Sequence, residues 1–288
     1  MVLVVGGGTM GAGIAEVLVR AGRHVVLCES DGDAAEAARA RVARGLERPA
    51  SPTPASPTPA PPTPAPPIPA PPDALSLLEV VAGIPDSPDA ELAVEAVFED
   101  ADLKRAVLRE IEARVPEDAL VATNTSALSI AELAGALGHP ERFLGMHFFN
   151  PVPRSSLVEL VVGPETTPES LERAREWVHL LGKEEIVVRD APGFATSRLG
   201  VAIGLEAIRM LEEGVASAED IDRGMVLGYR FPMGPLRLTD LVGLDVRLAI
   251  AEHLERSLGP RFAPPRLLRE KVAAGELGRK TGRGFFVW

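Results

Sequence analysis

The chain has 288 residues, enough for about two domains. Its net charge of −11 argues against general binding to nucleic acid or membranes, and no apolar run of about 18 residues could form a transmembrane helix. Cys28 is the single cysteine, so no internal disulfide can form and a reducing compartment is expected. An apolar segment follows Met1 directly, without a targeting signal, so we expect a cytoplasmic protein.

The first 29 residues have the pattern of a βαβ unit. We predict a strand over 2–5, a helix over 10–21 that Gly22 closes, and a second strand over 25–27. The second strand is a short continuous apolar run, which is typical of a parallel strand buried on both faces. Cys28 at its end is interpreted as a small buried residue.

A G-x-G-x-x-G sequence, residues 6–11, lies between the first strand and the helix. Gly6 permits the tight turn, Gly8 lets the backbone approach a pyrophosphate, and Gly11 lets the helix pack on the strand. Glu29 ends the second strand, where its carboxylate would bind ribose hydroxyls and repel a 2′-phosphate. The pattern predicts NAD as the cofactor, a glycine turn without a ligand being the alternative. The predicted cofactor-binding residues in this segment are Gly6, Gly8, Thr9, Met10, Gly11 and Glu29.

A polar, alanine-rich helix is predicted over 33–47, and a proline-rich insert follows over 49–72. Its five-residue unit repeats as SPTPA, SPTPA, PPTPA and PPIPA. Proline at nearly every second position excludes a helix, so we expect polyproline II or no fixed structure. The favoured interpretation of this insert is a linker or a loop that projects from the protein surface. The alternatives are a ligand for an SH3 or WW domain and a stretch translated in a shifted frame.

Strands and helices alternate again beyond Asp73. Further strands are predicted over 92–97, 120–123, 143–146, 157–162 and 186–188. One helix is predicted over 102–114. A second should begin at the capping box formed by Ser129 and Glu132, and a third at Thr167-Pro168. This alternation predicts the α/β class, with a Rossmann-type, doubly wound and mainly parallel sheet.

The pattern changes after Ala191-Pro192-Gly193. Strand signals end, a helical period runs to Gly214, and Ser217 opens the next helix. We therefore predict an NAD-binding Rossmann domain over 1–190, which includes the insert, and an all-helical domain over 191–288.

The segment His147-Phe148-Phe149-Asn150-Pro151-Val152-Pro153 follows a predicted strand, and Glu159 lies in the next one. The two side chains can therefore meet across neighbouring strands. A carboxylate that orients an imidazole and stabilises its protonated form makes a general base. Taken alone, a histidine beside Phe and Pro is more often a packing residue. No metal site is predicted.

Several fragments resemble the 3-hydroxyacyl-CoA dehydrogenase family, in the correct order and over nearly the whole chain except about residues 45–75. They are GGGTMGAGIA, NTSALSI, HFFNPVP with LVELV, DAPGF with SRL, and GRKTGRGFF. The resemblance implies NAD-dependent oxidation of an (S)-3-hydroxyacyl-CoA to the 3-oxoacyl-CoA, a reaction of fatty acid metabolism. It also implies a homodimer whose helical domain forms the interface and part of the acyl pocket.

The resemblance implies roles at the matching positions. His147 would be the catalytic base, Glu159 its orienting partner, and Ser126 a hydrogen-bond donor to the substrate oxygen that also approaches the nicotinamide. The remaining matches are Glu99, Lys104 and Lys280 as cofactor contacts and Asn150 and Ser197 as substrate contacts. Without the resemblance, Ser126 is simply a turn residue and the two lysines are solvated.

Ser197 is one departure from the family pattern, since many members carry an asparagine there that contacts the substrate carbonyl. The shorter hydroxyl can still donate one hydrogen bond. The alternative is a plain helix N-cap.

The proline-rich insert is the larger departure, because it replaces a helical hairpin that grips the CoA nucleotide in relatives. Gly45 and Pro52 stand where relatives offer a serine and a lysine. Arg41, Arg44 and Arg48 share one helical face and either supply the missing positive charge or form a solvated face.

These departures leave two other functions open. One is an NAD-dependent dehydrogenase of a small free hydroxy acid, such as an L-gulonate- or carnitine-like substrate. The other is a catalytically silent NAD-binding protein. The intact set of His147, Glu159 and Ser126 argues against the silent protein.

Overall fold

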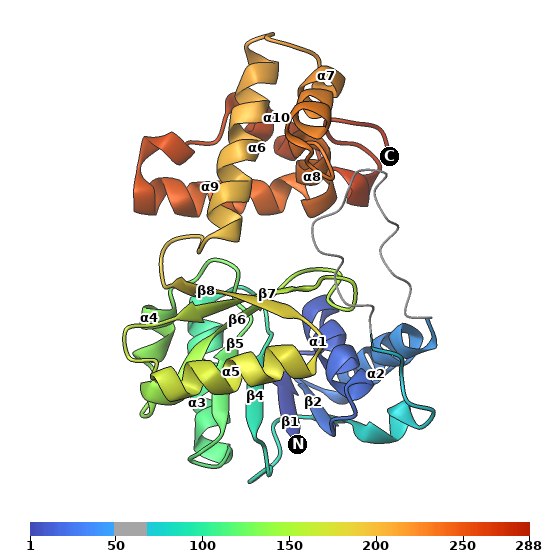
Figure 1. Cartoon of the computed structure of the whole chain (residues 1–288), viewed down its shortest axis with the longest axis vertical. Helices are drawn as coiled ribbons and strands as arrows, with labels where there is room; N and C mark the ends of the chain where they lie inside the picture. Colours follow the sequence, from blue (N-terminus) through green and yellow to red (C-terminus); the bar gives the residue numbers. More distant parts are fainter. Residues whose placement is uncertain (49–67) are drawn as a thin grey trace. The chain divides into compact units, whose positions relative to one another are not determined.

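The computed structural model describes residues 1–48 and 68–288. Most of the predicted insert 49–72, including Pro52, lies outside these residues. The described chain divides into two compact units at Asp190/Ala191 (Figure 1). In these ranges no helix is long and apolar enough to cross a membrane, and no cluster of His, Cys, Asp or Glu could hold a metal ion.

Within residues 1–48 and 68–190 the strands form an eight-stranded sheet in the order β3-β2-β1-β4-β5-β6-β7-β8. The strands are β1 (Val2–Val5), β2 (Val25–Glu29), β3 (Leu78–Ala82), β4 (Leu92–Glu95), β5 (Leu120–Thr123), β6 (Phe143–Phe148), β7 (Leu157–Val162) and β8 (Glu184–Arg189). All neighbours from β3 to β6 pair in parallel, β7 runs antiparallel to β6, and β8 pairs in parallel with β7. The chain reverses direction across the sheet between β1 and β4, where doubly wound sheets bind their ligands. The predicted fold is confirmed.

Helices flank this sheet (Figure 1). They are α1 (Thr9–Arg20), α2 (Gly32–Glu47), α3 (Ala101–Arg114), α4 (Ile130–Ala134) and α5 (Pro168–Leu180), with short 3₁₀ turns at Ala74–Leu77 and Pro140–Arg142. Ser129 and Thr167 cap α4 and α5 by accepting a backbone N–H three residues on, as predicted. Asp31 and Asp100 cap α2 and α3 in the same way.

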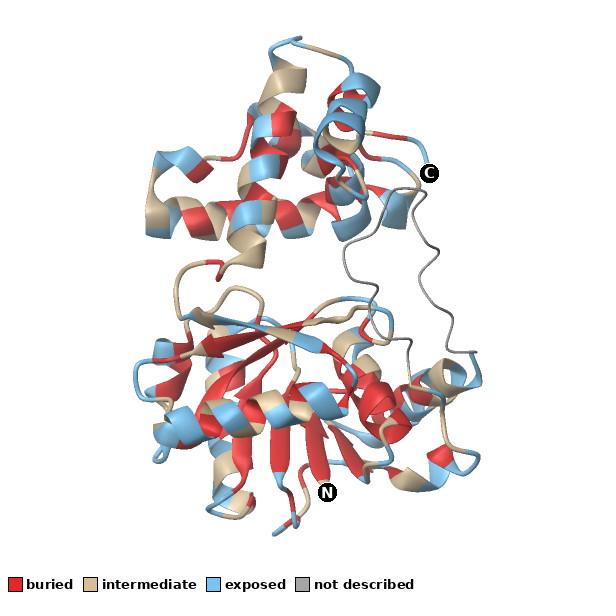
Figure 2. Cartoon of the chain, viewed as in Figure 1, coloured by how far each residue is buried: buried red, intermediate tan, exposed pale blue. Residues whose placement is uncertain are grey.

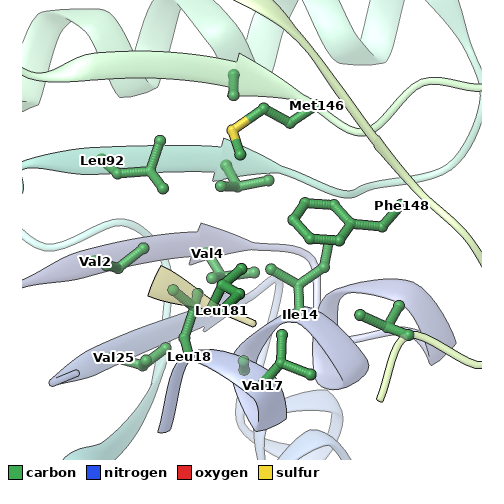
Figure 3. Close-up of a cluster of buried hydrophobic side chains, with 14 of the residues drawn as sticks. Val2, Val4, Ile14, Val17, Leu18, Val25, Leu92, Met146, Phe148 and Leu181 are labelled. Carbon is green, nitrogen blue, oxygen red and sulfur yellow. The ribbon is translucent and has the colours of Figure 1, made fainter. Parts of the chain in front are cut away.

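The main core lies between one face of the sheet and α1, α2 and α5. Val2 and Val4 of β1 point toward Ile14 and Leu18 of α1, and Phe148 of β6 reaches the same cluster (Figure 3). Each such buried side chain stabilises the fold by about 1.5–3 kcal/mol. The central strands are almost entirely buried (Figure 2), so their carboxyl-terminal ends are rigid supports for the residues that follow them.

The structure corrects two details of the predicted strands. Strand β3 was not predicted, because it lies at the sheet edge and only Leu78 of its five residues is buried. Strand β6 extends to Phe148, so His147 lies within the strand instead of at its end.

Residues 191–288 form a helical unit with its own core. Its helices are α6 (Thr196–Glu212), α7 (Ala218–Arg223), α8 (Pro235–Val242), α9 (Leu244–Leu258) and α10 (Arg266–Ala273), with short turns at Gly224–Gly228, Pro260–Phe262 and Arg279–Thr281. Gly214 follows α6 with a φ of 73°, and Ser217 caps α7, both as predicted. In the described part of this unit, the only β-type pairing consists of isolated bridges near its C-terminal end.

Candidate active site

The turn between β1 and α1 needs glycine at two positions and is open at a third. Gly6 has a φ of +99°, and a Cβ on Gly11 would lie 1.7 Å from the Gly6 carbonyl oxygen. A Cβ on Gly8 would meet no atom within 4 Å, so the backbone at the N-terminus of α1 faces open space. A phosphate group fits there, because helical N–H groups point outward at the positive end of the helix.

Glu29 lies at this turn, as predicted. Its Oε1 accepts a hydrogen bond of 2.8 Å from the Gly7 N–H, so the end of β2 is tied to the glycine loop. Arg41 of α2 donates to the Gly7 carbonyl oxygen at 3.0 Å. The carboxylate is thereby positioned beside the phosphate-binding turn, where it can bind ribose hydroxyls.

A polar network lies at the ends of β4 and β5. Lys104 is 1% exposed, so its interpretation as a solvated lysine is wrong. Its Nζ lies 2.8 Å from Glu95 Oε1 and 3.4 Å from Glu99 Oε2. Glu99 Oε1 in turn accepts hydrogen bonds from Thr125 Oγ1 at 2.6 Å and from the Ser126 N–H at 2.8 Å.

The structure therefore brings together three predicted residues, Glu99, Lys104 and Ser126. Sequence reasoning missed Glu95, which is fully buried at the end of β4. An acidic residue that ends an otherwise apolar strand is the signal that could have identified it.

His147 and Glu159 are direct partners in the antiparallel ladder of β6 and β7. His147 Nδ1 lies 3.0 Å from Glu159 Oε2, and the two residues are 5% and 0% exposed. A hydrogen bond from Nδ1–H to the carboxylate leaves Nε2 as the proton acceptor. Asn124 Oδ1 accepts the Phe148 N–H at 2.8 Å, which fastens the turn before Ser126 to β6.

A cleft of about 340 Å³ lies between α1, α2 and the loop that follows β6. Arg41, Arg44 and Arg48 line it together with Arg154, and all three side chains on the predicted arginine face are exposed. Thr9 and Asn150 are also in its wall. The cleft thus joins the glycine turn to the segment after His147.

Gly45 has a local explanation. A Cβ there would lie 2.1 Å from Glu16 Oε2, because Glu16 pairs with Arg20 at 3.0 Å beneath α2. Arg20 also donates to the carbonyl oxygens of Gly45 and Arg48, at 2.9 and 3.1 Å. A side chain at this position would therefore have to displace the Glu16 carboxylate from its place beside Arg20.

Ser197 and Lys280 belong to the helical unit. Ser197 is half-buried in the first turn of α6, and the N-cap residue is Ala195, so the N-cap interpretation of Ser197 is wrong. Lys280 is paired with Asp245 at 2.5 Å.

Two family models match the chain: the NAD-binding domain of 3-hydroxyacyl-CoA dehydrogenase over residues 1–191, and the C-terminal domain of the same family over residues 193–288. The chain belongs to the 3-hydroxyacyl-CoA dehydrogenase family. It is an NAD-dependent oxidoreductase, and the glycine turn and Glu29 fit its cofactor.

Relatives of this dehydrogenase family cover the chain from end to end. A 3-hydroxybutyryl-CoA dehydrogenase of Mycobacterium tuberculosis is 41% identical, over 99% of this chain and 97% of its own. The crystal structure of M. tuberculosis FadB2 has a TM-score of 0.89 at 40% identity, covering 100% of this chain and 98% of its own. That of (S)-3-hydroxybutyryl-CoA dehydrogenase PaaH1 from Ralstonia eutropha has a TM-score of 0.86 at 37% identity, with the same coverage.

Proposed function

We propose that the chain oxidises the 3-hydroxyl group of an (S)-3-hydroxyacyl-CoA, with His147 as the general base. The buried pair of His147 and Glu159, 3.0 Å apart at neighbouring positions of the sheet, is the observation that carries the proposal. Relatives of this chain are 3-hydroxybutyryl-CoA dehydrogenases, so that thioester is the first substrate to test.

The bound NAD supplies a hydride acceptor. His147 Nε2 takes the hydroxyl proton, and Glu159 stabilises the positive charge that develops on the ring. A general base of this kind accelerates the reaction by about 10²–10⁴-fold. Ser126 donates a hydrogen bond to the substrate oxygen, and Glu99 supports this role by accepting the Ser126 N–H.

Cofactor binding is assigned to the glycine turn (Gly6, Gly8, Thr9, Met10 and Gly11), Glu29, Glu99, Lys104, Ser126 and Lys280. The glycine turn supports this assignment by its open backbone. The buried pair of Glu95 and Lys104, together with the exposed Glu99, supports it by holding the turn of Ser126 at the edge of the sheet.

The arginine cleft favours CoA over a free acid. Five arginines line the cleft, and although Arg20 pairs with Glu16, the other four can provide an anion site on a chain whose net charge is −11. The several phosphates of a CoA nucleotide match four cations better than the single carboxylate of a small hydroxy acid does. We therefore assign Arg41, Arg44, Arg48 and Arg154 to the CoA phosphates, and Asn150, in the same wall, to the substrate.

We also propose that the enzyme is a cytoplasmic homodimer. The helical unit exposes large apolar side chains, among them Leu227 and Tyr229 at 71% and 75%. Exposed apolar groups of this size support a protein interface. Light scattering of the purified protein tests the dimer, and a monomeric mass would contradict it.

The first experiment measures NADH formation from (S)-3-hydroxybutyryl-CoA beside free 3-hydroxybutyrate, L-gulonate and L-carnitine. We expect turnover of the thioester alone, and a loss of about 10²–10⁴-fold in kcat in His147→Gln. His179→Gln is the matched control, because His179 pairs with Glu185 at 2.8 Å on the surface. Turnover of a free acid only would replace the CoA assignment, and NAD binding without any turnover would favour the silent protein.

A further inference from the structure

Phe98, in the loop between β4 and α3, is a highly exposed aromatic residue. It is 87% exposed, whereas Leu75, which comes next among the large apolar residues of the described ranges 1–48 and 68–190, is 42% exposed. A single exposed apolar side chain needs no explanation by itself. The place of Phe98 in the fold gives its exposure a function.

The backbone of the loop is fixed on both sides of Phe98. The Val97 N–H donates to Glu95 Oε1 at 2.7 Å, and the Val97 carbonyl oxygen accepts from Lys104 Nζ at 3.3 Å. The Phe98 carbonyl oxygen accepts the Asp100 N–H at 2.8 Å, where Asp100 caps α3. The buried pair of Glu95 and Lys104 therefore gives the exposed ring a rigid support.

The same loop lies between the glycine turn and the turn of Ser126. A Cβ on Gly6 would lie 2.8 Å from the carbonyl carbon and oxygen of Ala96, so the two backbones are in contact. On the other side, Glu99 Oε1 accepts the Ser126 N–H at 2.8 Å. Residues 96–99 thus connect the two turns at the point where the sheet reverses direction, which is where doubly wound sheets bind dinucleotides.

We propose that Phe98 is a cofactor-binding residue whose ring covers the nicotinamide half of bound NAD. A dinucleotide with its pyrophosphate at the glycine turn and its nicotinamide beside Ser126 passes over the loop between them. The inference rests on the proposed place of Ser126 at the nicotinamide. An aromatic ring can pack against the faces of the nicotinamide and its ribose, and both partners lose water-exposed apolar surface in that contact.

The test measures the binding of NADH and of ADP, which ends at the pyrophosphate, to the full chain without an acyl substrate. In Phe98→Ala the Kd of NADH should rise by about 5–20-fold, because part of an aromatic contact is lost, whereas the Kd of ADP should change by less than about twofold. Phe98→Leu should keep part of the NADH affinity. The nicotinamide emission of NADH bound to Phe98→Ala should also lie closer to that of free NADH.

Leu75→Ala is the matched control. Leu75 is exposed and apolar but precedes β3, whereas Phe98 follows β4, so the two residues lie at opposite ends of parallel strands. This control should bind both nucleotides as the wild type does. Because Phe98 is exposed, its variants should unfold at the wild-type urea concentration.

An unchanged NADH affinity in Phe98→Ala would overturn the inference. Equal losses of NADH and ADP affinity would overturn it too, since the effect would then lie at the glycine turn. Normal NADH binding with a raised KM for 3-hydroxybutyryl-CoA would assign the ring to the acyl substrate instead. Because these affinities are measured without turnover, a failure of the proposed function would appear separately, as NADH binding without oxidation of the thioester.

Discussion

Glu95 shows how one buried residue supports the candidate site. Its carboxylate accepts hydrogen bonds from Lys104 Nζ at 2.8 and 3.0 Å, from Thr123 Oγ1 at 2.6 Å and from the Val97 N–H at 2.7 Å. It thus neutralises Lys104 and ties β4 to β5. Glu95 does not contact the reacting atoms in the proposed mechanism, so it is a positioning residue.

Glu95→Gln should lower the free energy of unfolding by about 3–5 kcal/mol, because it leaves the buried Lys104 ammonium with only the partly exposed Glu99 carboxylate, 3.4 Å away, as a counter-charge. Lys104→Met combined with Glu95→Gln should recover much of this loss, since the uncompensated charge is then gone. Urea denaturation of both single variants and the double variant measures the coupling. Strict additivity of the two single losses would show that the pair does not interact as described.

For single residues, the sequence predicted the spatial neighbours correctly where both residues belong to a recognisable motif. It paired His147 with Glu159, and the ladder of β6 and β7 brings the two together. It did not predict the burial of Lys104, since its partner Glu95 is nine residues away and only the fold places α3 against β4.

At the scale of elements, the loop between β6 and β7 is held by Lys183, the residue directly before β8. The side chain is 7% exposed, and its Nζ donates to the carbonyl oxygens of Val152, at 2.7 Å, and Ser155. Burial lowers the pKa of Lys183 from 10.5 to about 8. Val152 also lines the arginine cleft, so the same contact shapes one wall of the proposed CoA site.

This lowered pKa predicts a pH dependence of stability. Between about pH 8 and 10.5 the unfolded chain holds a proton on Lys183 that the folded chain has released. The contribution of Lys183 to stability is therefore greatest above pH 10.5, decreases as the pH falls, and becomes constant below about pH 8. Relative to Lys183→Met, the wild type should lose free energy of unfolding as the pH is lowered through this window. A wild-type-minus-variant difference that is flat across these pH values in urea denaturation would contradict the prediction.

The elements themselves were predicted well wherever apolar residues are buried on both faces. Strand β1 is a continuous apolar run, β2 and β5 are apolar except for their last residues, and the positions of all three in the sequence were predicted to within two residues. Strand β3 was missed because an edge strand needs neither continuous burial nor clear alternation. The insert 49–72 could be recognised only by composition, and most of it is outside the described residues.

At the scale of the whole molecule, the arginine cleft is a local positive site on an acidic protein. With a net charge of −11, the chain as a whole repels an anionic substrate, so binding depends on the field close to the cleft. Salt screens such a field over about 10 Å at 0.1 M ionic strength.

Raising the salt concentration from about 0.05 to 0.3 M should therefore increase the KM for 3-hydroxybutyryl-CoA by roughly 3–10-fold. The pantetheine thioester, which lacks the nucleotide phosphates, should show little change. The double variant Arg41→Gln/Arg44→Gln should raise the KM of the CoA thioester at low salt and flatten its salt dependence. Equal responses of the two thioesters would assign the CoA phosphates to another surface.

The antiparallel pairing of β6 and β7 has a consequence for how such an enzyme can diversify. His147 and Glu159 face each other because of the strand register, which hydrogen bonds within the sheet maintain. The residues between the two strands, including those in the cleft wall, do not set the distance between imidazole and carboxylate. Insertions, deletions or grafted sequences in that loop can therefore alter substrate range without disturbing the proton-transfer pair, which makes it the segment to vary when new specificities are sought by directed evolution.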